Sequence, residues 1–152
     1  MAYDVMIKEL PAQNVLLVRT RVTMATIGEA MGAAFDTLMR HAAATGAQSA
    51  GPPCVLYPQM PDGEYEIDVC LPVGPDAEPG EGVVFGELPE TEAATLMYQG
   101  PYDAMEPAWR HLIEWVGANG RQPAGPMREV YLNTPGEVAP AELLTELVIP
   151  LG

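Results

Sequence analysis

The chain has 152 residues, of which 48% are hydrophobic, so it is long enough and apolar enough to fold as one domain with its own core. Its net charge of −14, from 21 acidic and 7 basic residues, argues against direct binding to DNA or RNA. No apolar stretch reaches the roughly 20 residues of a membrane span, and the first residues do not resemble a signal peptide. We therefore expect a soluble, cytoplasmic protein that does not bind membranes.

The first half of the chain predicts one helix and three strands. The helix has apolar residues at helical spacing and begins at Thr26, which has the spacing of a capping box with Glu29. It ends at Gly46, and residues 61–63 form a turn between the last two strands. The strands, which are rich in β-branched and apolar residues, are predicted over residues 15–22, 54–60 and 64–71.

Residues 74–82 carry no apolar anchor and predict a linker loop, after which the second half repeats the same order of elements. Its helix carries Trp109 on the apolar stripe, which favours a core position for this residue. Asp103 is a candidate N-cap, while Pro107 favours a helix start nearer Glu106. The strands of this half are predicted over residues 93–99, 128–133 and 143–149.

Short phrases that recur in the same order indicate an internal duplication. Residues 9–11 recur at 87–89, residues 50–52 recur at 124–126, and residues 68–72 match residues 146–150. We therefore expect a single α+β domain, residues 1–152, made of two β-α-β-β units with pseudo-two-fold symmetry, antiparallel sheets, two main helices and a central ligand cleft. The repeats are assigned to residues 1–73 and 83–152, with residues 74–82 as the linker.

Alternation along the predicted strands suggests where a site would lie. It places Tyr57 and Asp68 of the first half where Tyr131 and Glu146 stand in the second, so that two pairs of an aromatic residue and an acid approach one axis. A groove between related units, apolar with a few polar groups, is a natural ligand site. The alternative is that these are ordinary solvent-facing strand residues, and alternation alone slightly favours it.

Four stretches that cover almost the whole chain carry a family resemblance. They are IKELPAQNVLLVRTRV (7–22), AGPPCVLY (50–57), QGPYDAMEPAWRHLIEW (99–115) and AGPMREVYLNTPGEVAPAELLTELVIPL (124–151). In their order and spacing they resemble the GyrI-like small-molecule-binding domain, the effector-binding module often attached to AraC-type and MerR-type transcription regulators. The resemblance implies a duplicated fold with a central cleft that binds lipophilic, often cationic or planar compounds.

The resemblance also implies roles for single residues. Glu146 matches the family's buried acid that meets the ligand's charge, Tyr131 matches an aromatic residue of the same pocket, and Tyr102 matches the tyrosine of the GPY signature. Tyr98 stands where relatives often carry histidine. The helix pattern, independently of the resemblance, places Trp115 beside the apolar stripe, at a cleft edge or over the core. From the resemblance, the helix pattern and the strand alternation together, the candidate ligand-binding residues are Glu146, Tyr131, Tyr102, Trp109, Tyr57, Asp68, Tyr98 and Trp115.

The remaining reactive residues predict no metal and no cofactor. Cys54 and Cys70 are too few and too far apart for a zinc-ligand pattern, so buried thiols are favoured, and a disulfide requires their strands to pair. His41 and His111 are expected at the surface, because neither is matched with a serine or cysteine that would suggest a hydrolytic triad.

Three functions agree with these residues. The first is a stand-alone binding domain for lipophilic, planar or cationic small molecules, of the multidrug-binding or sequestering type, since no helix-turn-helix precedes the first strand. The resemblance also suggests a hydrolase that opens cyclopropane-bearing DNA-alkylating natural products, with Glu146 as base and Tyr131 as orienting hydroxyl. The third is a gyrase-inhibitor-like protein with a protein partner.

Overall fold

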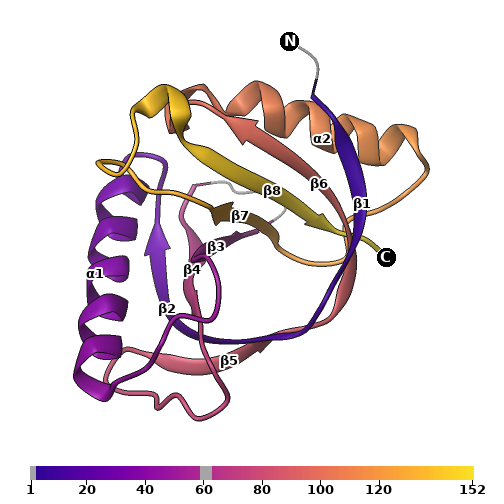
Figure 1. Ribbon diagram of the computed structural model, residues 1–152. Helices are drawn as coiled ribbons and strands as arrows, with labels where there is room; N and C mark the ends of the chain where they lie inside the picture. Colours follow the sequence, from indigo (N-terminus) through magenta and orange to yellow (C-terminus); the bar gives the residue numbers. More distant parts are fainter. Residues whose placement is uncertain (1–2, 59–62) are drawn as a thin grey trace. The chain divides into compact units, whose positions relative to one another are not determined.

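The computed structural model describes residues 3–58 and 63–152, and the chain divides into two compact units (Figure 1). Unit 1 joins the N-terminal segment up to Leu10 to Thr91–Gly152, and unit 2 comprises Pro11–Glu90. In the described residues each unit has one long helix and four antiparallel strands, so the predicted α+β class is confirmed. No helix in this described part is long and apolar enough to cross a membrane.

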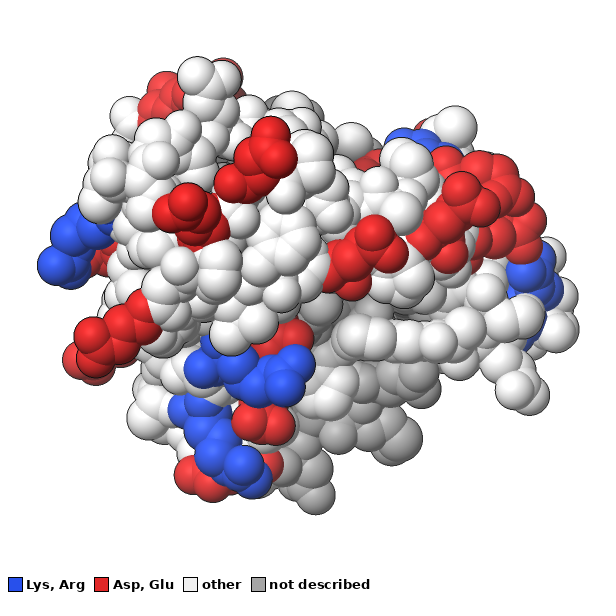
Figure 2. Space-filling model, turned by 90° about the horizontal axis from the view of Figure 1, so that it is seen from below, with Lys and Arg blue, Asp and Glu red and all other residues white. Residues whose placement is uncertain are grey.

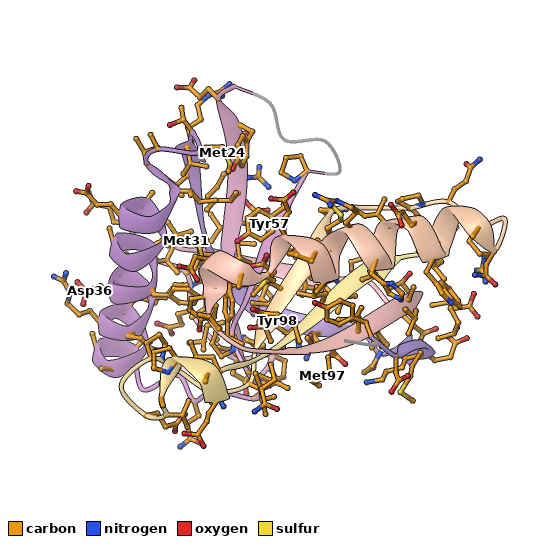
Figure 3. The ribbon with its side chains drawn as sticks, turned by 90° about the horizontal axis from the view of Figure 1, so that it is seen from above. Met24, Met31, Asp36, Tyr57, Met97 and Tyr98 are labelled. Atoms are coloured by element: carbon orange, nitrogen blue, oxygen red, sulfur yellow. The ribbon has the colours of Figure 1, made fainter. Side chains whose placement is uncertain are left out.

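In unit 2 the strands lie in the order β5-β2-β4-β3, with α1 packed on one face of the sheet. The elements are β2 (Gln13–Val22), α1 (Ile27–Thr45), β3 (Cys54–Tyr57), β4 (Tyr65–Pro72) and β5 (Val84–Leu88). Helix α1 buries Ala34, Leu38 and Ala42. Figure 3 shows Met31 of this helix directed toward Tyr57 of β3. Helix α1 therefore covers the face of the sheet from which Tyr57 projects.

In unit 1 the strands lie in the order β1-β6-β8-β7. The elements are β1 (Val5–Leu10), β6 (Thr91–Gln99), the 3₁₀ turn η1 (Tyr102–Ala104), α2 (Glu106–Ala118), β7 (Met127–Tyr131), the 3₁₀ turn η2 (Pro140–Glu142) and β8 (Leu144–Pro150). Helix α2 packs Leu112 and Val116 against Leu96, Leu147 and Ile149 of the sheet. Burying these side chains supplies the main stabilisation of the unit.

The predicted helices and six strands are confirmed, but the two strands β1 and β5 were not predicted. Both are short, and both carry the duplicated phrase Glu-Leu-Pro at their ends. Strand β1 pairs with β6, and β5 pairs with β2. Strand β1 comes from the first half of the chain but completes the sheet of unit 1, which holds α2. Strand β5 comes from the second half and completes the sheet of unit 2, which holds α1. Of the predicted strand 54–60, residues 59 and 60 lie outside the described residues, as do residues 61 and 62 of the turn.

The predicted end of α1 at Gly46 is confirmed, but the two predicted N-caps are wrong. Thr26 makes no capping bond, because its hydroxyl oxygen accepts a hydrogen bond from the Thr23 backbone N–H at 2.9 Å. The competing local turn therefore replaces the capping box with Glu29. Asp103 lies inside η1 and does not cap α2, which begins at Glu106 as Pro107 favoured.

Candidate functional site

Four residues of unit 1, which we call the Glu129 cluster, form a small polar and aromatic group. The indole Nε1 of Trp109 donates a hydrogen bond to one carboxylate oxygen of Glu129 at 2.8 Å, and the hydroxyl of Tyr131 donates to the other at 2.8 Å. The ring of Tyr102 stands edge-on to that of Tyr131, with 5.7 Å between centroids. The cluster thus places a carboxylate among three aromatic rings.

Local structure explains why these residues meet. Glu129 and Tyr131 are two residues apart on β7 and therefore project from the same face of the sheet. Trp109 lies on α2, half-buried, and packs against the core of unit 1, as its position on the apolar stripe predicted. Turn η1 comes directly before this helix and supplies Tyr102.

Burial within the cluster is graded. Tyr131 is 7% exposed and Tyr102 is 41% exposed, while Glu129 and Trp109 are intermediate. Partial burial raises the pKa of Tyr102, and the nearby charge of Glu129 raises it further. The negative field of the carboxylate therefore reaches a ring that is open to solvent.

Tyr98 and Thr145 lie under the cluster in the sheet. Thr145 of β8 is directly opposite both Tyr98 of β6 and Tyr131 of β7. The buried Tyr98 hydroxyl donates to the Pro101 carbonyl at 2.7 Å, and burial is the main cause that raises the pKa of this phenol. Tyr98 therefore holds the turn that leads into η1. Within the described residues, the hydroxyl of Thr145 is the buried side-chain group that has no hydrogen-bond partner.

Glu146 lies on the opposite face of the same sheet. The register places Val130 opposite Glu146 and Tyr131 opposite Thr145, so neighbouring residues 145 and 146 point to different faces. The carboxylate of Glu146 accepts a hydrogen bond from the Lys8 ammonium at 2.7 Å, with 16% of its side chain exposed. The structure thus does not bring Glu146 and Tyr131 together, and it pairs the charge of Glu146 with a cation from β1.

Unit 2 shows the same separation of its predicted pair. The Tyr57 hydroxyl contacts the sulfur of Met31 at 3.7 Å on the face covered by α1. Asp68 is opposite Leu56, the residue next to Tyr57, and so lies on the other face. There it receives two hydrogen bonds from Arg19, at 2.8 and 3.0 Å, and this contact raises the pKa of Arg19.

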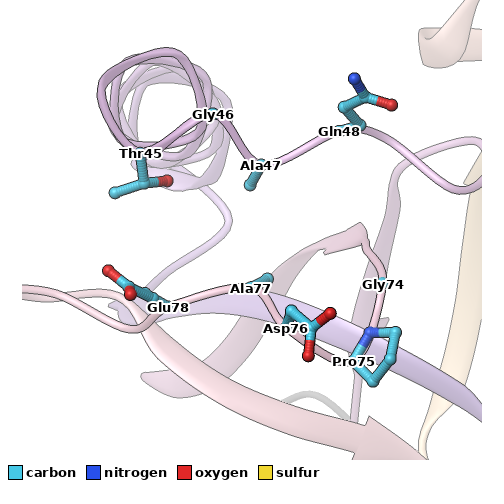
Figure 4. A pocket seen from close by; sticks show the side chains of 9 residues that line it. All are labelled: Thr45, Gly46, Ala47, Gln48, Gly74, Pro75, Asp76, Ala77 and Glu78. Atoms are coloured by element: carbon cyan, nitrogen blue, oxygen red, sulfur yellow. The ribbon is translucent and has the colours of Figure 1, made fainter.

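A shallow hollow of about 240 Å³ lies between the end of α1 and the loop after β4 (Figure 4). It is lined by Thr45, Gly46, Ala47, Gln48, Gly74, Pro75, Asp76, Ala77 and Glu78. The hollow has no aromatic lining and contains none of the predicted site residues. It lies close to His41, whose Nε2 is hydrogen-bonded to the Glu78 carbonyl at 2.6 Å. His41 therefore ties the predicted linker to the helix.

The surface charge agrees with the composition. Figure 2 shows one face of the molecule, on which acidic side chains are scattered and basic side chains lie beside acidic ones. Two arginines of unit 2, Arg19 and Arg21, are each paired with an acid. Across the described residues no group of three or more histidine, cysteine or acidic side chains could hold a metal ion.

Glu129 is the residue that the candidate list lacked. The signal was present in the sequence, because Glu129 is two residues before Tyr131 in the phrase REVY and so shares its face. Of the candidate ligand-binding residues predicted from the sequence, the structure brings Tyr102, Tyr131 and Trp109 together. Trp115 packs against the core of unit 1.

Several solved structures have the same fold as this chain. The C-terminal domain of EcmrR is 22% identical, with a TM-score of 0.89 over 100% of this chain and 99% of that domain. A hydrolase from Listeria innocua is 14% identical, with a TM-score of 0.67 over 97% and 91% of the two chains. SAV2435, solved with bound tetraphenylphosphonium, is 10% identical, with a TM-score of 0.65 over 100% and 94%. At these identities the likeness shows the fold alone.

The family model for the GyrI-like small molecule binding domain matches residues 3–151. This match extends over both units, and it covers the strands β1 and β5 that the sequence patterns missed. The chain belongs to the family of GyrI-like small-molecule-binding domains.

Proposed function

We propose that this protein binds lipophilic cations, and that the Glu129 cluster supplies the charge and the aromatic surface for them. The single observation that carries the proposal is the carboxylate of Glu129 held between Trp109 and Tyr131. The indole N–H of Trp109 and the hydroxyl of Tyr131 are neutral groups, so these two hydrogen bonds orient the carboxylate without cancelling its negative charge. The carboxylate of Glu146 is paired with an ammonium group.

The aromatic rings add to the attraction. The face of a tryptophan or tyrosine attracts a cation by about 0.5–2 kcal/mol, depending on how far the cation is desolvated. Trp109, Tyr131 and Tyr102 surround the carboxylate, and Tyr102 is 41% exposed. A planar or multi-ring cation can therefore contact rings and carboxylate together, whereas a small hydrated cation gains little from the rings.

Thr145 supports the same location. A fully buried hydroxyl without a partner is uncommon in folded proteins and calls for an explanation. It lies between Tyr98 and Tyr131 on the face that carries Glu129. A polar atom of a ligand or of a water held beneath it would satisfy this hydroxyl.

A thermal-shift titration with tetraphenylphosphonium tests binding, and triphenylphosphine oxide serves as its neutral counterpart. The cation is expected to raise Tm more than the neutral compound at equal concentration. Tryptophan emission locates the site, since quenching by the cation should be lost in Trp109→Phe and kept in the matched control Trp115→Phe. Equal shifts for both compounds, or quenching that depends on Trp115, would refute the assignment.

A second candidate function is hydrolysis of cyclopropane-bearing DNA-alkylating compounds. Its support is the hydrogen bond between Tyr131 and Glu129, which joins a phenol to a carboxylate that can act as base. The Glu129 carboxylate would take a proton from a water molecule while the oxygen of that water bonds to a carbon of the cyclopropane ring. The electron pair of the broken carbon–carbon bond would pass into the conjugated ketone, whose oxygen is then protonated.

Turnover distinguishes this reaction from binding. A duocarmycin-type substrate should gain the mass of one water molecule in the presence of the protein, and the rate should fall in Glu129→Gln and Tyr131→Phe. Glu146→Gln, on the other face of the sheet, tests the base that the family resemblance implies. No product above the buffer rate would leave binding as the activity of the cluster.

A further inference from the structure

Cys54 and Cys70 lie directly opposite each other on neighbouring strands of unit 2. Strands β3 and β4 are antiparallel, with Cys54 opposite Cys70 and Val55 opposite Val69. Residues that are directly opposite project from the same face, with Cα atoms about 4.5–5.5 Å apart. This spacing falls within the range of about 4.4–6.8 Å in which two cysteines can close a disulfide.

Both cysteines are reduced and buried in the structure, with 2% of Cys54 and 0% of Cys70 exposed. The sulfur of Cys70 lies 3.7 Å from the Asp68 carbonyl and donates a weak hydrogen bond to it, as a protonated thiol does. Because both thiols are buried, they are protected from oxidants while the strands stay closed.

Cys54 lies at the end of a short strand. It is the first residue of β3, a strand of four residues, and it follows the loop residues Pro52 and Pro53. The end of a short strand separates at a lower free energy than the centre of a long one, because fewer hydrogen bonds and buried contacts are lost. Local opening therefore exposes Cys54 without unfolding the unit.

We propose that Cys54 and Cys70 are a peroxide-sensitive pair that closes a reversible disulfide across β3 and β4. A peroxide oxidises the sulfur of Cys54 to a sulfenic acid and is itself reduced, which for hydrogen peroxide releases one water molecule. The sulfur of Cys70 then attacks the oxidised sulfur. The S–S bond forms as the S–OH bond breaks, and the hydroxyl leaves with the thiol proton of Cys70 as a second water molecule. A dithiol reductant reverses the reaction by thiol–disulfide exchange.

The folded protein is treated with hydrogen peroxide, unfolded with an alkylating agent present, and weighed intact by mass spectrometry. We expect the wild type to lose the mass of two hydrogen atoms, to resist alkylation, and to recover two alkylatable thiols after dithiothreitol. Cys54→Ser and Cys70→Ser each keep one cysteine and should not lose this mass. The oxidised wild type should also melt at a higher temperature than the reduced protein, because the cross-link restricts the unfolded chain.

Three results would overturn the proposal. The first is two alkylatable thiols in the folded wild type after a treatment that oxidises the same cysteines in urea. The second is sulfinic or sulfonic acid as the main product, and the third is a disulfide between two chains instead of within one.

Discussion

Replacing Tyr131 by phenylalanine removes one donor from Glu129 and leaves the ring in place. Hydrogen bonds to charged groups contribute about 1.5–3 kcal/mol to folding. The Tyr131 hydroxyl lies 2.8 Å from the carboxylate, and Tyr131 is 7% exposed. Because Glu129 is only half-buried, the hydrogen bond contributes less free energy to folding than it would at a fully buried site. We expect Tyr131→Phe to lower the free energy of unfolding by about 1–2 kcal/mol.

The partner of the hydroxyl is identified by a double-mutant cycle with Glu129→Ala, measured by urea unfolding. In the Glu129→Ala background the loss caused by Tyr131→Phe should shrink, which gives a coupling free energy of about 1 kcal/mol. Tyr98→Phe is the matched control, because its hydroxyl bonds to the Pro101 carbonyl and should show no coupling to residue 129. Additive effects of Tyr131→Phe and Glu129→Ala, within about 0.3–0.5 kcal/mol, would refute the existence of the cluster as described.

Three further predictions concern the stability of unit 1. The raised pKa of Tyr98 means that the folded state binds its phenolic proton more tightly than the unfolded chain, whose tyrosines titrate near 10.0. This contribution to the free energy of unfolding is complete below pH 10 and is lost as the pH rises toward the folded pKa. Urea unfolding should therefore show a steeper fall of the free energy of unfolding above pH 10 in the wild type than in Tyr98→Phe. Equal slopes for the two proteins would contradict this prediction. Gly100→Ala should lower Tm, because Gly100 has a φ of 144° and an added Cβ would meet the Tyr98 hydroxyl at 2.8 Å; an unchanged Tm would disprove the close approach. Leu112→Ala, at 0% exposure, should cost about 2–5 kcal/mol in urea unfolding, and a loss below about 1 kcal/mol would show that α2 is loosely packed.

Periodicity was enough to predict the helices and the buried strands. Each of these segments has a long apolar pattern at one spacing, so its secondary structure follows from its own residues. Strands β1 and β5 were missed because they are short and mix charged with apolar residues, so their pairing with distant strands decides their conformation. The repeated Glu-Leu-Pro phrase was the available sign that these segments are structured. The internal duplication itself stays an interpretation.

The candidate site was predictable only in part, for the same reason. Alternation along β7 places Glu129 and Tyr131 on one face, and this could be derived from the sequence. The bond from Trp109 to Glu129 depends on how α2 packs on the sheet, which no local pattern gives. The ion pair of Glu146 with Lys8 joins residues 138 positions apart through a strand that was not predicted. Motif matching therefore selected Glu146, while packing groups the aromatic residues around Glu129.

The dissociation constant of tetraphenylphosphonium for wild type, Glu129→Gln and Glu146→Gln tests the central claim most directly. An opposite charge at 4 Å near a protein surface is worth about 4 kcal/mol, and partial exposure of the carboxylate reduces this to roughly 1.4–2.8 kcal/mol. Calorimetric titration should therefore show binding weakened roughly tenfold to a hundredfold in Glu129→Gln and within about twofold of wild type in Glu146→Gln. Binding that is lost in Glu146→Gln and kept in Glu129→Gln would contradict the account and place the charge anchor on the other face of the sheet.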